Sequence, residues 1–273
     1  MSFNKSESAH RRLTTILPLW CSFYGVTCGN ISGSSNFASV TSIDIGYLNL
    51  TGTIPTEIGN FELLNMLSVA YNYLNGTIPT QIGSLTSAES IYLGGNEFSG
   101  TIPSNIGELT SLIAVDMGGN NITGNIPETI GSLLSLEALG IDTNHLSGSI
   151  PSNITLLTRL IFIGLNNNDL SGKIPSMIGN LRNLTSLYLD FNLLTGLIPE
   201  SFMNMTVLDN LTLSDNYLSM GSATSVPIST FSSYTLKRRH INLDRNCLVF
   251  KYMSYSTNAT HCLPKHNGTM KTV

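Results

Sequence analysis

The sequence predicts an α/β repeat solenoid, because one pattern of 24 residues returns along most of the 273-residue chain. Proline occupies the same place in each repeat, at Pro55, Pro79, Pro103, Pro127, Pro151, Pro175 and Pro199. Glycine stands three residues before each of these prolines, from Gly52 to Gly196. An asparagine recurs with the same period, at Asn72, Asn96, Asn120, Asn144, Asn168, Asn192 and Asn216.

The full repeat is L-x-x-L-x-L-x-x-N-x-L-x-G-x-I-P, as in residues 160–183, and it is the pattern of a leucine-rich repeat. Alternating leucines should point inward from a short strand, with the residues between them facing solvent. Strands of successive coils then pair in parallel, about 4.8 Å apart. We therefore expect a right-handed arc with a parallel β-sheet on its concave face and short helical or 3-10 turns on its convex face.

The period divides the chain into three parts. Residues 1–39 form an N-terminal segment and disulfide cap, and residues 40–237 form an array of about eight 24-residue coils, the last one irregular. Residues 238–273 form a final strand, expected at 241–243, and a C-terminal cap. Because the pattern decays after Leu208 and the distance from one strand to the next grows from 24 to 30 residues, residues 219–237 are predicted to be an insertion.

The four cysteines lie in the two caps. Cys21 and Cys28 precede the first repeat, and Cys247 and Cys262 follow the last. A C-x6-C spacing does not match the C-x2-4-C spacing of zinc modules, so we expect disulfides Cys21–Cys28 and Cys247–Cys262. A zinc site built from Cys247, Cys262 and the nearby histidines is the weaker alternative, and no metal is expected.

The recurring asparagine must turn the chain out of the strand inside a nearly dry core. Its amide can satisfy backbone groups that the turn leaves unpaired, and identical asparagines stacked along the solenoid can each serve the neighbouring coil. Leu48 takes this place in the first repeat. We therefore predict a structural asparagine ladder.

Composition restricts the possible partners. Charged residues make up 11% of the chain and the net charge is −4, which argues against nucleic acid as a partner. The one basic cluster, residues 237–240, is interpreted as a solvated edge or as a patch for an acidic partner. No apolar run has the length of a membrane span, and a signal peptide is not evident.

Eleven Asn-x-Ser/Thr sequons favour a secreted, glycosylated protein. The glycosylation candidates are Asn30, Asn75, Asn121, Asn153, Asn183, Asn204, Asn210 and Asn258. These features predict an extracellular location, in the cell wall or at the cell surface.

No catalytic constellation is recognisable, so we expect no enzyme activity and no cofactor. Asp142 and Asp190 share a repeat position two coils apart, which places their backbones roughly 10 Å apart. That spacing is at the outer limit for an inverting glycosidase, and no apolar pocket is evident to raise one pKa.

The concave face is better suited to binding a protein or peptide ligand. Exposed aromatic residues on a rigid surface are typical anchors, and the middle coils carry only glycine at positions such as Gly94, Gly95, Gly118 and Gly119. The candidate ligand-binding residues are Tyr47, Tyr71, Tyr92, Asp116, Asp142, Phe162, Tyr188, Asp190 and Phe191.

The W-C-S-F-Y-G-V-T-C cap, the G-x-I-P-x-x-I-G-x-L signature and the 24-residue period resemble the plant-type extracellular leucine-rich repeat family. This family includes the ectodomains of receptor-like kinases and receptor-like proteins, and the polygalacturonase-inhibiting proteins. In the cap, Phe23 occupies the position at which the family usually has tryptophan, and the preceding helical segment is short or absent.

The resemblance implies ligand recognition in signalling or defence, with a co-receptor kinase or a wall-degrading enzyme as further partners. Two alternatives remain open. One is an inhibitor of a cell-wall-degrading enzyme such as polygalacturonase. The other is a truncated ectodomain of a receptor-like kinase or receptor-like protein.

Overall fold

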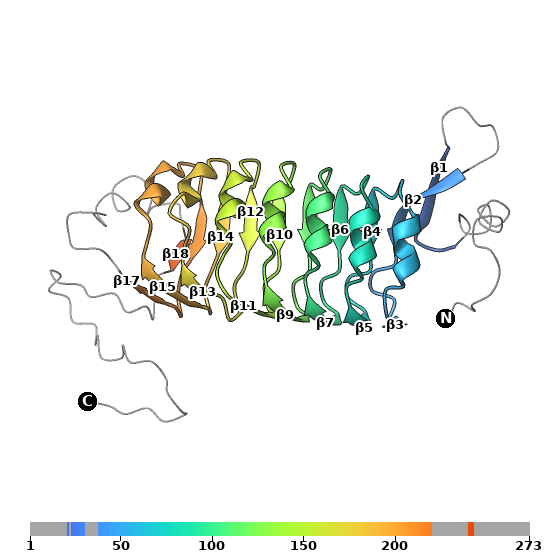
Figure 1. Cartoon of the computed structure of the whole chain (residues 1–273), viewed down its shortest axis with the longest axis horizontal. Coiled ribbons are helices and arrows are strands. Elements are labelled where there is room, and N and C mark those ends of the chain that lie inside the picture. Colours follow the sequence, from blue (N-terminus) through green and yellow to red (C-terminus); the bar gives the residue numbers. More distant parts are fainter. Residues whose placement is uncertain (1–20, 22, 31–37, 220–239, 243–273) are drawn as a thin grey trace, which may run out of the picture.

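A computed structural model describes residues 21, 23–30, 38–219 and 240–242 (Figure 1). The predicted Cys247–Cys262 disulfide and the sequon at Asn258 lie outside these residues. The described coils stack side by side into one elongated array, with β1 at one end and β17 at the other (Figure 1). Each regular coil contributes a strand to a main sheet, a strand to a flanking sheet and a 3-10 turn.

The main sheet has ten strands in the order β1-β2-β4-β6-β8-β10-β12-β14-β16-β18, and it forms the concave face. Every pairing from β2 onward is parallel, and successive partners are in the same register, as in Ile91 beside Val115. The strands are β1 (Val26–Asn30), β2 (Ala38–Asp44), β4 (Met66–Ser68), β6 (Ser90–Tyr92), β8 (Ala114–Asp116), β10 (Ala138–Gly140), β12 (Phe162–Gly164), β14 (Ser186–Tyr188), β16 (Asn210–Thr212) and β18 (His240–Asn242).

The short strands after the asparagine turns form two flanking sheets. The five-stranded sheet contains β3 (Thr51–Gly52), β5 (Tyr73–Thr77), β7 (Glu97–Thr101), β9 (Asn121–Asn125) and β11 (His145–Ser147). The three-stranded sheet contains β13 (Ser171–Lys173), β15 (Leu193–Leu197) and β17 (Tyr217–Ser219). A single bridge between Ser149 and Ser171 connects the two sheets.

Seven 3-10 turns lie on the convex side, where the sequence predicts short helical turns. They are η1 (Thr56–Asn60), η2 (Thr80–Ser84), η3 (Ser104–Glu108), η4 (Glu128–Ser132), η5 (Ser152–Leu156), η6 (Ile178–Asn180) and η7 (Glu200–Asn204). In η1 the carbonyl of Pro55 accepts a hydrogen bond from the backbone N–H of Ile58, 3.1 Å away. Proline has no backbone N–H, and at the start of a helical turn that N–H would have no partner within the turn. The side chain of Ile58 closes the core.

Between these layers, leucine and isoleucine side chains form one continuous core. Leu67, Ile91, Val115 and Leu139 project into it from adjacent strands of the main sheet, each at most 2% exposed. The predicted right-handed leucine-rich repeat solenoid, with its parallel sheet and short 3-10 turns, is therefore confirmed.

The asparagine ladder runs through this core as a set of repeated hydrogen bonds. The Oδ1 atom of Asn120 accepts from the backbone N–H of Phe98 at 3.0 Å, and its Nδ2 atom donates to the carbonyls of Leu93 and Met117. Equivalent bonds recur for the other six ladder asparagines, all buried: Asn72, Asn96, Asn144, Asn168, Asn192 and Asn216. Each asparagine thus joins two neighbouring coils. In the first coil, Leu48 donates its backbone N–H to Asn72 instead.

The N-terminal cap contains one strand that the repeat pattern does not reveal. A disulfide joins Cys21 to Cys28, and β1 pairs antiparallel with β2. The main sheet therefore begins with a hairpin rather than with the first repeat strand. At the other end, the final strand is His240–Asn242, one residue earlier than expected.

No helix within the described residues is long and apolar enough to span a membrane. Those same residues contain no group of three or more His, Cys, Asp and Glu side chains arranged to hold a metal ion.

Candidate functional site: the concave sheet face

The candidate residues of the concave face occupy parallel rows, because every coil places equivalent residues side by side. The strand-end row contains Tyr92, Asp116, Gly140, Gly164 and Tyr188 in consecutive strands. Phe162 lies at the start of β12, in the row formed by the first residues of the strands. Asp142 and Asp190 lie two residues beyond their strands, in a third row.

A fourth row, three residues beyond the end of each strand, has an unusual backbone conformation. Tyr47, Tyr71, Thr143, Asn167, Phe191 and Asp215 all have φ between 53° and 57°, and Gly95 and Gly119 have φ values of 66° and 64°. This left-handed conformation turns the chain into the residue that follows, which is the buried asparagine in every coil except the first, where it is Leu48. Three of the six candidate aromatic residues, Tyr47, Tyr71 and Phe191, therefore project from this turn and not from a strand.

At the centre of the face, the carboxylates of Asp116 and Asp142 approach each other over glycine. A Cβ atom built on Gly118 would lie 2.9 Å from Asp142 Oδ1 and 3.2 Å from Asp116 Oδ1. The same test on Gly94 places Asp116 Oδ2 at 2.6 Å. The two carboxylates therefore fill space that is open only because these positions lack side chains.

Each carboxylate has one hydrogen bond from its own turn. The backbone N–H of Gly118 donates to Asp116 Oδ1 at 2.9 Å, and the hydroxyl of Thr143 donates to Asp142 Oδ2 at 3.1 Å. Partial burial raises the pKa of Asp116, the Gly118 hydrogen bond opposes this shift, and the charge of Asp142 adds to it. The centre of the concave face is thus a carboxylate pair with a glycine floor, which we call the acidic trough (Gly94, Asp116, Gly118, Gly140, Asp142 and Gly164).

An aromatic pair lies on the N-terminal side of the trough. The rings of Tyr47 and Tyr71 stack with centroids 4.5 Å apart and an interplanar angle of 15°. The Tyr71 ring continues over Gly95, where an added Cβ would come within 2.7 Å of its Cδ1 atom. Tyr47 remains 73% exposed and Tyr71 55%, so the stacked pair presents a large apolar surface to solvent. Slight desolvation of the Tyr47 hydroxyl, together with the charge of and hydrogen bond to the neighbouring Tyr71, raises the pKa of Tyr47.

A second aromatic pair lies on the C-terminal side. Phe162 and Tyr188 meet at a centroid distance of 5.7 Å and an angle of 52°. The Phe162 ring leans over Gly164, whose hypothetical Cβ would lie 3.2 Å from the ring and 3.3 Å from Asp142 Oδ1. Phe191, 48% exposed, lies further along in the turn row.

Asp142 and Asp190 share a repeat position, but their side chains have different neighbours in the structure. Asp190 accepts a hydrogen bond from the hydroxyl of Thr212, whereas Asp142 leans toward Asp116. Repeat spacing alone could not show this, because the direction of each side chain depends on which neighbour is glycine. Gly94, Gly118, Gly140 and Gly164 form the trough floor, and their sequence signal is the absence of side chains in adjacent coils.

The flanking sheets present a different surface, made of a row of hydroxyl groups. Ser99, Thr123, Ser147, Ser171, Thr195 and Ser219 each donate to the carbonyl of a glycine in the preceding coil, at 3.1 to 3.4 Å. These donors are already used within the protein. This face therefore offers fewer free donors than its composition suggests.

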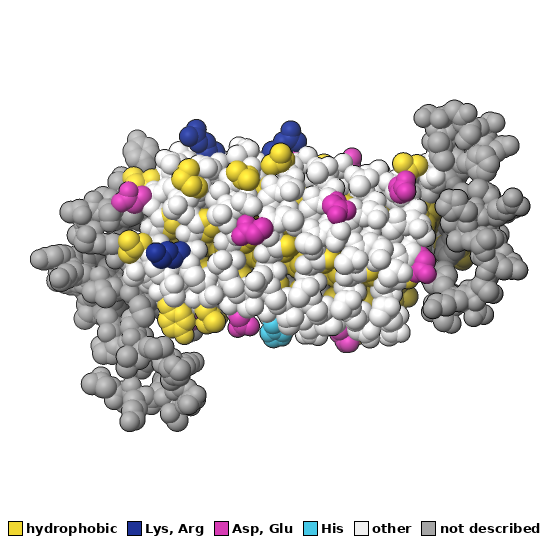
Figure 2. Space-filling view, in the orientation of Figure 1, with side chains coloured by type: hydrophobic (Ala, Val, Ile, Leu, Met, Phe, Trp, Pro, Cys, Tyr) yellow, Lys and Arg dark blue, Asp and Glu magenta, His cyan; other side chains and the backbone are white. Residues whose placement is uncertain are grey.

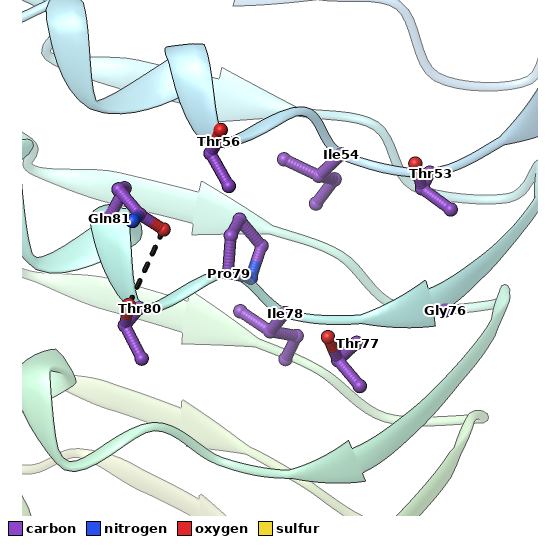
Figure 3. Close-up of a pocket in the computed structure, with 9 residues that line it drawn as sticks. All are labelled: Thr53, Ile54, Thr56, Gly76, Thr77, Ile78, Pro79, Thr80 and Gln81. Carbon is purple, nitrogen blue, oxygen red and sulfur yellow. Dashed lines mark hydrogen bonds between the residues drawn. The ribbon is translucent and has the colours of Figure 1, made fainter.

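A shallow pocket of about 600 Å³ lies where the first two coils pass from the flanking sheet to η1 and η2 (Figure 3). Its walls are Ile and Pro side chains with several threonines, and the hydroxyl of Thr80 donates to Gln81 at 3.3 Å. None of its nine lining residues is an acid, a base, a histidine or a cysteine. It therefore contains no ionisable side chain that could act as a general acid or base or activate a threonine hydroxyl.

The described sequons lie mainly away from the trough. Asn75 and Asn121 are exposed on the flanking sheet, and Asn153, Asn183 and Asn204 are exposed in or after the 3-10 turns. Asn210 is the exception, since it lies half-buried in β16 and donates to the Ser186 hydroxyl at 3.0 Å. Glycans on the exposed candidates would leave the acidic trough open.

These observations define a leucine-rich repeat scaffold with an open sheet face. Leucine-rich repeat family models match residues 87–109, 111–133 and 158–218. A comparison with curated proteins gave no match.

Several solved plant receptor structures are similar to this chain. The plant peptide hormone receptor RGFR1 in complex with RGF2 is 39% identical, with a TM-score of 0.68 over 73% of this chain and 31% of that one. The Arabidopsis receptor kinase HAESA ectodomain with an IDA peptide is 32% identical, with a TM-score of 0.71 over 84% and 37%. The Arabidopsis SOBIR1 ectodomain is 32% identical, with a TM-score of 0.52 over 59% and 91%.

The chain belongs to the plant-type extracellular leucine-rich repeat family. It spans about a third of the length of the RGFR1 and HAESA structures and most of the length of the SOBIR1 ectodomain.

Proposed function

We propose that this protein is an extracellular recognition module that binds a peptide or protein segment on its concave sheet face. The observation that carries this proposal is the acidic trough, a glycine-floored surface between two aromatic pairs. Aromatic anchors on rigid strands lose little conformational entropy on binding. The Asp116 and Asp142 carboxylates, which lie over Gly94 and Gly118, offer hydrogen-bond acceptors to a ligand at the centre of the face.

The similar structures support this class of ligand. RGFR1 and HAESA were each solved with a peptide hormone, and HAESA was also solved with the co-receptor SERK1. By analogy, a co-receptor kinase is a further proposed partner and signalling is the proposed context. Because those proteins are much longer than this chain, both extensions are tested separately from ligand binding.

A displayed peptide library selected on the full-length secreted protein tests the proposal. Tyr92→Lys and Phe162→Lys remove an aromatic ring and place a positive charge on the concave face, one on each side of the trough. Leu156→Lys is the matched control, because Leu156 is 56% exposed in η5 on the convex side. We expect selected peptides to lose at least tenfold in affinity for the two concave variants and to keep their affinity for the control. Selected peptides that bind all four proteins equally would contradict the proposal.

An inhibition assay separates this function from the alternative of a wall-degrading-enzyme inhibitor. The purified protein is added to several polygalacturonases at concentrations that saturate peptide binding. Peptide binding without inhibition supports recognition, and potent inhibition that is lost in Tyr92→Lys supports the inhibitor function.

A further inference from the structure

We propose that the segment bound on the concave face is basic and extended, and that one of its lysine or arginine side chains lies over Gly118 between Asp116 and Asp142. This inference rests on the proposed function and specifies the chemistry of the ligand. It starts from the distribution of charge over the described array.

Acidic and basic residues are strongly segregated along the chain. Residues 38–219 contain 15 of the 17 Asp and Glu residues but only three of the 13 Lys and Arg residues. This part therefore has a formal charge of −12, far from the −4 of the whole chain. A ligand approaching the array meets a negative potential that attracts cations over a distance of about a Debye length.

The three basic residues of the array lie on other faces. Arg159 and Arg182 line a shallow hollow beside η5 and η6, together with Asn183, and Lys173 lies in the flanking strand β13. The convex side seen in Figure 2 is mostly uncharged, with scattered acidic and basic side chains. Within residues 38–219, the concave face and its rim thus carry acids without a compensating Lys or Arg. The acids are Asp44, Glu89, Asp116, Glu137, Asp142, Asp190, Asp209 and Asp215.

The acidic trough concentrates this charge at one point. Asp116 and Asp142 are held close together by the absence of side chains at Gly94, Gly118 and Gly164, and neither forms an ion pair with another described residue. Bringing two carboxylates together is unfavourable without a cation. A basic side chain over Gly118 would reach both carboxylates and relieve their repulsion.

The surroundings fit an alkyl or guanidinium chain. Tyr92 is the direct neighbour of Asp116 in the sheet, and Tyr188 is the direct neighbour of Gly164. A cation within about 6 Å of a tyrosine ring is attracted to its face. From Tyr92 to Tyr188 the row crosses five strands, a distance of about 19 Å at a typical strand spacing. About six residues of extended chain would cover it.

A charge-matched pair of double variants tests this inference. Asp116→Asn/Asp142→Asn removes two charges from the trough, and Glu128→Gln/Glu200→Gln removes two charges from the first residues of η4 and η7. Both variants weaken the long-range field by the same amount. The probes are an octa-arginine peptide, an octa-glutamate peptide and a neutral Gly-Ser octapeptide, at about 0.15 M salt to limit long-range attraction.

We expect octa-arginine to bind the wild-type protein and to lose at least tenfold in affinity for the trough variant but less than twofold for the control variant. Thermal melting checks that both variants remain folded. Equal losses in the two variants would show diffuse attraction and overturn the inference, as would tighter binding of octa-glutamate.

Two further outcomes separate this inference from the proposed function. If library-selected peptides are sensitive to Tyr92→Lys but not enriched in Lys or Arg, the basic ligand is wrong and concave-face binding stands. If no selected peptide is sensitive to Tyr92→Lys, the proposed function itself fails. Wild-type oligomers that dissociate in the trough variant would identify a second copy of this chain as the occupant, and would overturn a separate basic ligand.

Discussion

The buried asparagine supplies hydrogen bonds to backbone N–H and C=O groups that the turn after each strand would leave unpaired. Asn144 shows this most simply: its Nδ2 atom donates to three carbonyls, including that of Met117 in the preceding coil, and its Oδ1 atom accepts from Ile122. A single side chain thus satisfies backbone groups of two coils.

We therefore predict that Asn144→Ala destabilises the protein by about 1–3 kcal/mol, because several buried backbone groups lose their partners. Asn65→Ala is the matched control, since Asn65 is exposed at the edge of β4, and it should change stability by less than about 0.5 kcal/mol. Denaturant melts of both variants measure the difference. Equal stability of the two variants would show that the ladder is not needed.

Asp116 predicts a pH dependence with a definite sign. Its pKa is raised in the folded protein, so ionisation of Asp116 reduces stability at neutral pH. This penalty should disappear as the pH falls through the folded pKa toward the ordinary carboxyl value of about 3.9. Asp116→Asn keeps an acceptor for the Gly118 N–H and removes the charge. We expect it to raise the melting temperature at pH 7, with a gain that shrinks as the pH falls through the raised pKa of Asp116 and is absent below about pH 4.

Thermal melts from pH 3 to pH 8 measure this effect. Asp209→Asn, which removes a charge from an exposed rim residue, is the control and should not reproduce the pH-dependent gain. A lower melting temperature of Asp116→Asn at pH 7 would contradict the sign.

At the scale of elements, the 3-10 turns stack so closely that one repeat position is glycine in five of the seven coils. A Cβ on Gly107 would lie 2.5 Å from the carbonyl oxygen of Thr129 in the next coil. The equivalent position holds Thr155 two coils later, and there the following turn, η6, is only three residues long. The larger side chain is thus accommodated where the adjacent turn is altered.

Gly107→Ala should therefore cost about 1–3 kcal/mol through overpacking. Thr155→Ala, at the position that already holds a larger side chain, should cost less, losing mainly the hydroxyl bond to the Ser152 carbonyl. Equilibrium unfolding of the two variants compares them, and a stability ranking in the opposite order would contradict this packing argument.

The N-terminal hairpin depends on a covalent link rather than on the repeat. Replacing Cys21 and Cys28 by serine removes a short-loop disulfide worth about 2.5 kcal/mol on the chain-entropy model. We expect hydrogen exchange to increase in β1 and β2 and to remain unchanged in β10. Uniform exchange along the array would show that the cap does not act locally.

Sequence periodicity predicts most of these elements, because every regular coil buries equivalent side chains in the same way. It does not predict β1, which pairs antiparallel and occurs once. It also places Tyr47 and Tyr71 correctly on the concave side without showing that they stack from a left-handed turn. The Asp116–Asp142 pair depends on side-chain direction between coils, and a repeat template contains no information about that direction.

At the scale of the whole molecule, coils that contact only their neighbours should be removable as units. Deletion of residues 113–136 removes one full period, so that Glu137 follows Leu112 and takes the repeat position of Ile113. The shortened protein should fold, with a lower melting temperature. Deletion of residues 113–124, half a period, should prevent cooperative folding. Circular dichroism and calorimetry compare the two proteins, and a folded half-period deletion would contradict the unit-coil description.

The left-handed turn row also has a consequence for the redesign of binding specificity. Positions 140 and 164 lie in extended strands, so their backbone conformation suits any side chain in a library. Positions 95 and 119 have φ near 65°, where β-branched residues are strained by about 1–2 kcal/mol. A randomised library should therefore be depleted of Val and Ile at 95 and 119 relative to 140 and 164, and should keep Gly, Asn, Asp, Tyr and Phe, which occupy the equivalent turn position in this protein.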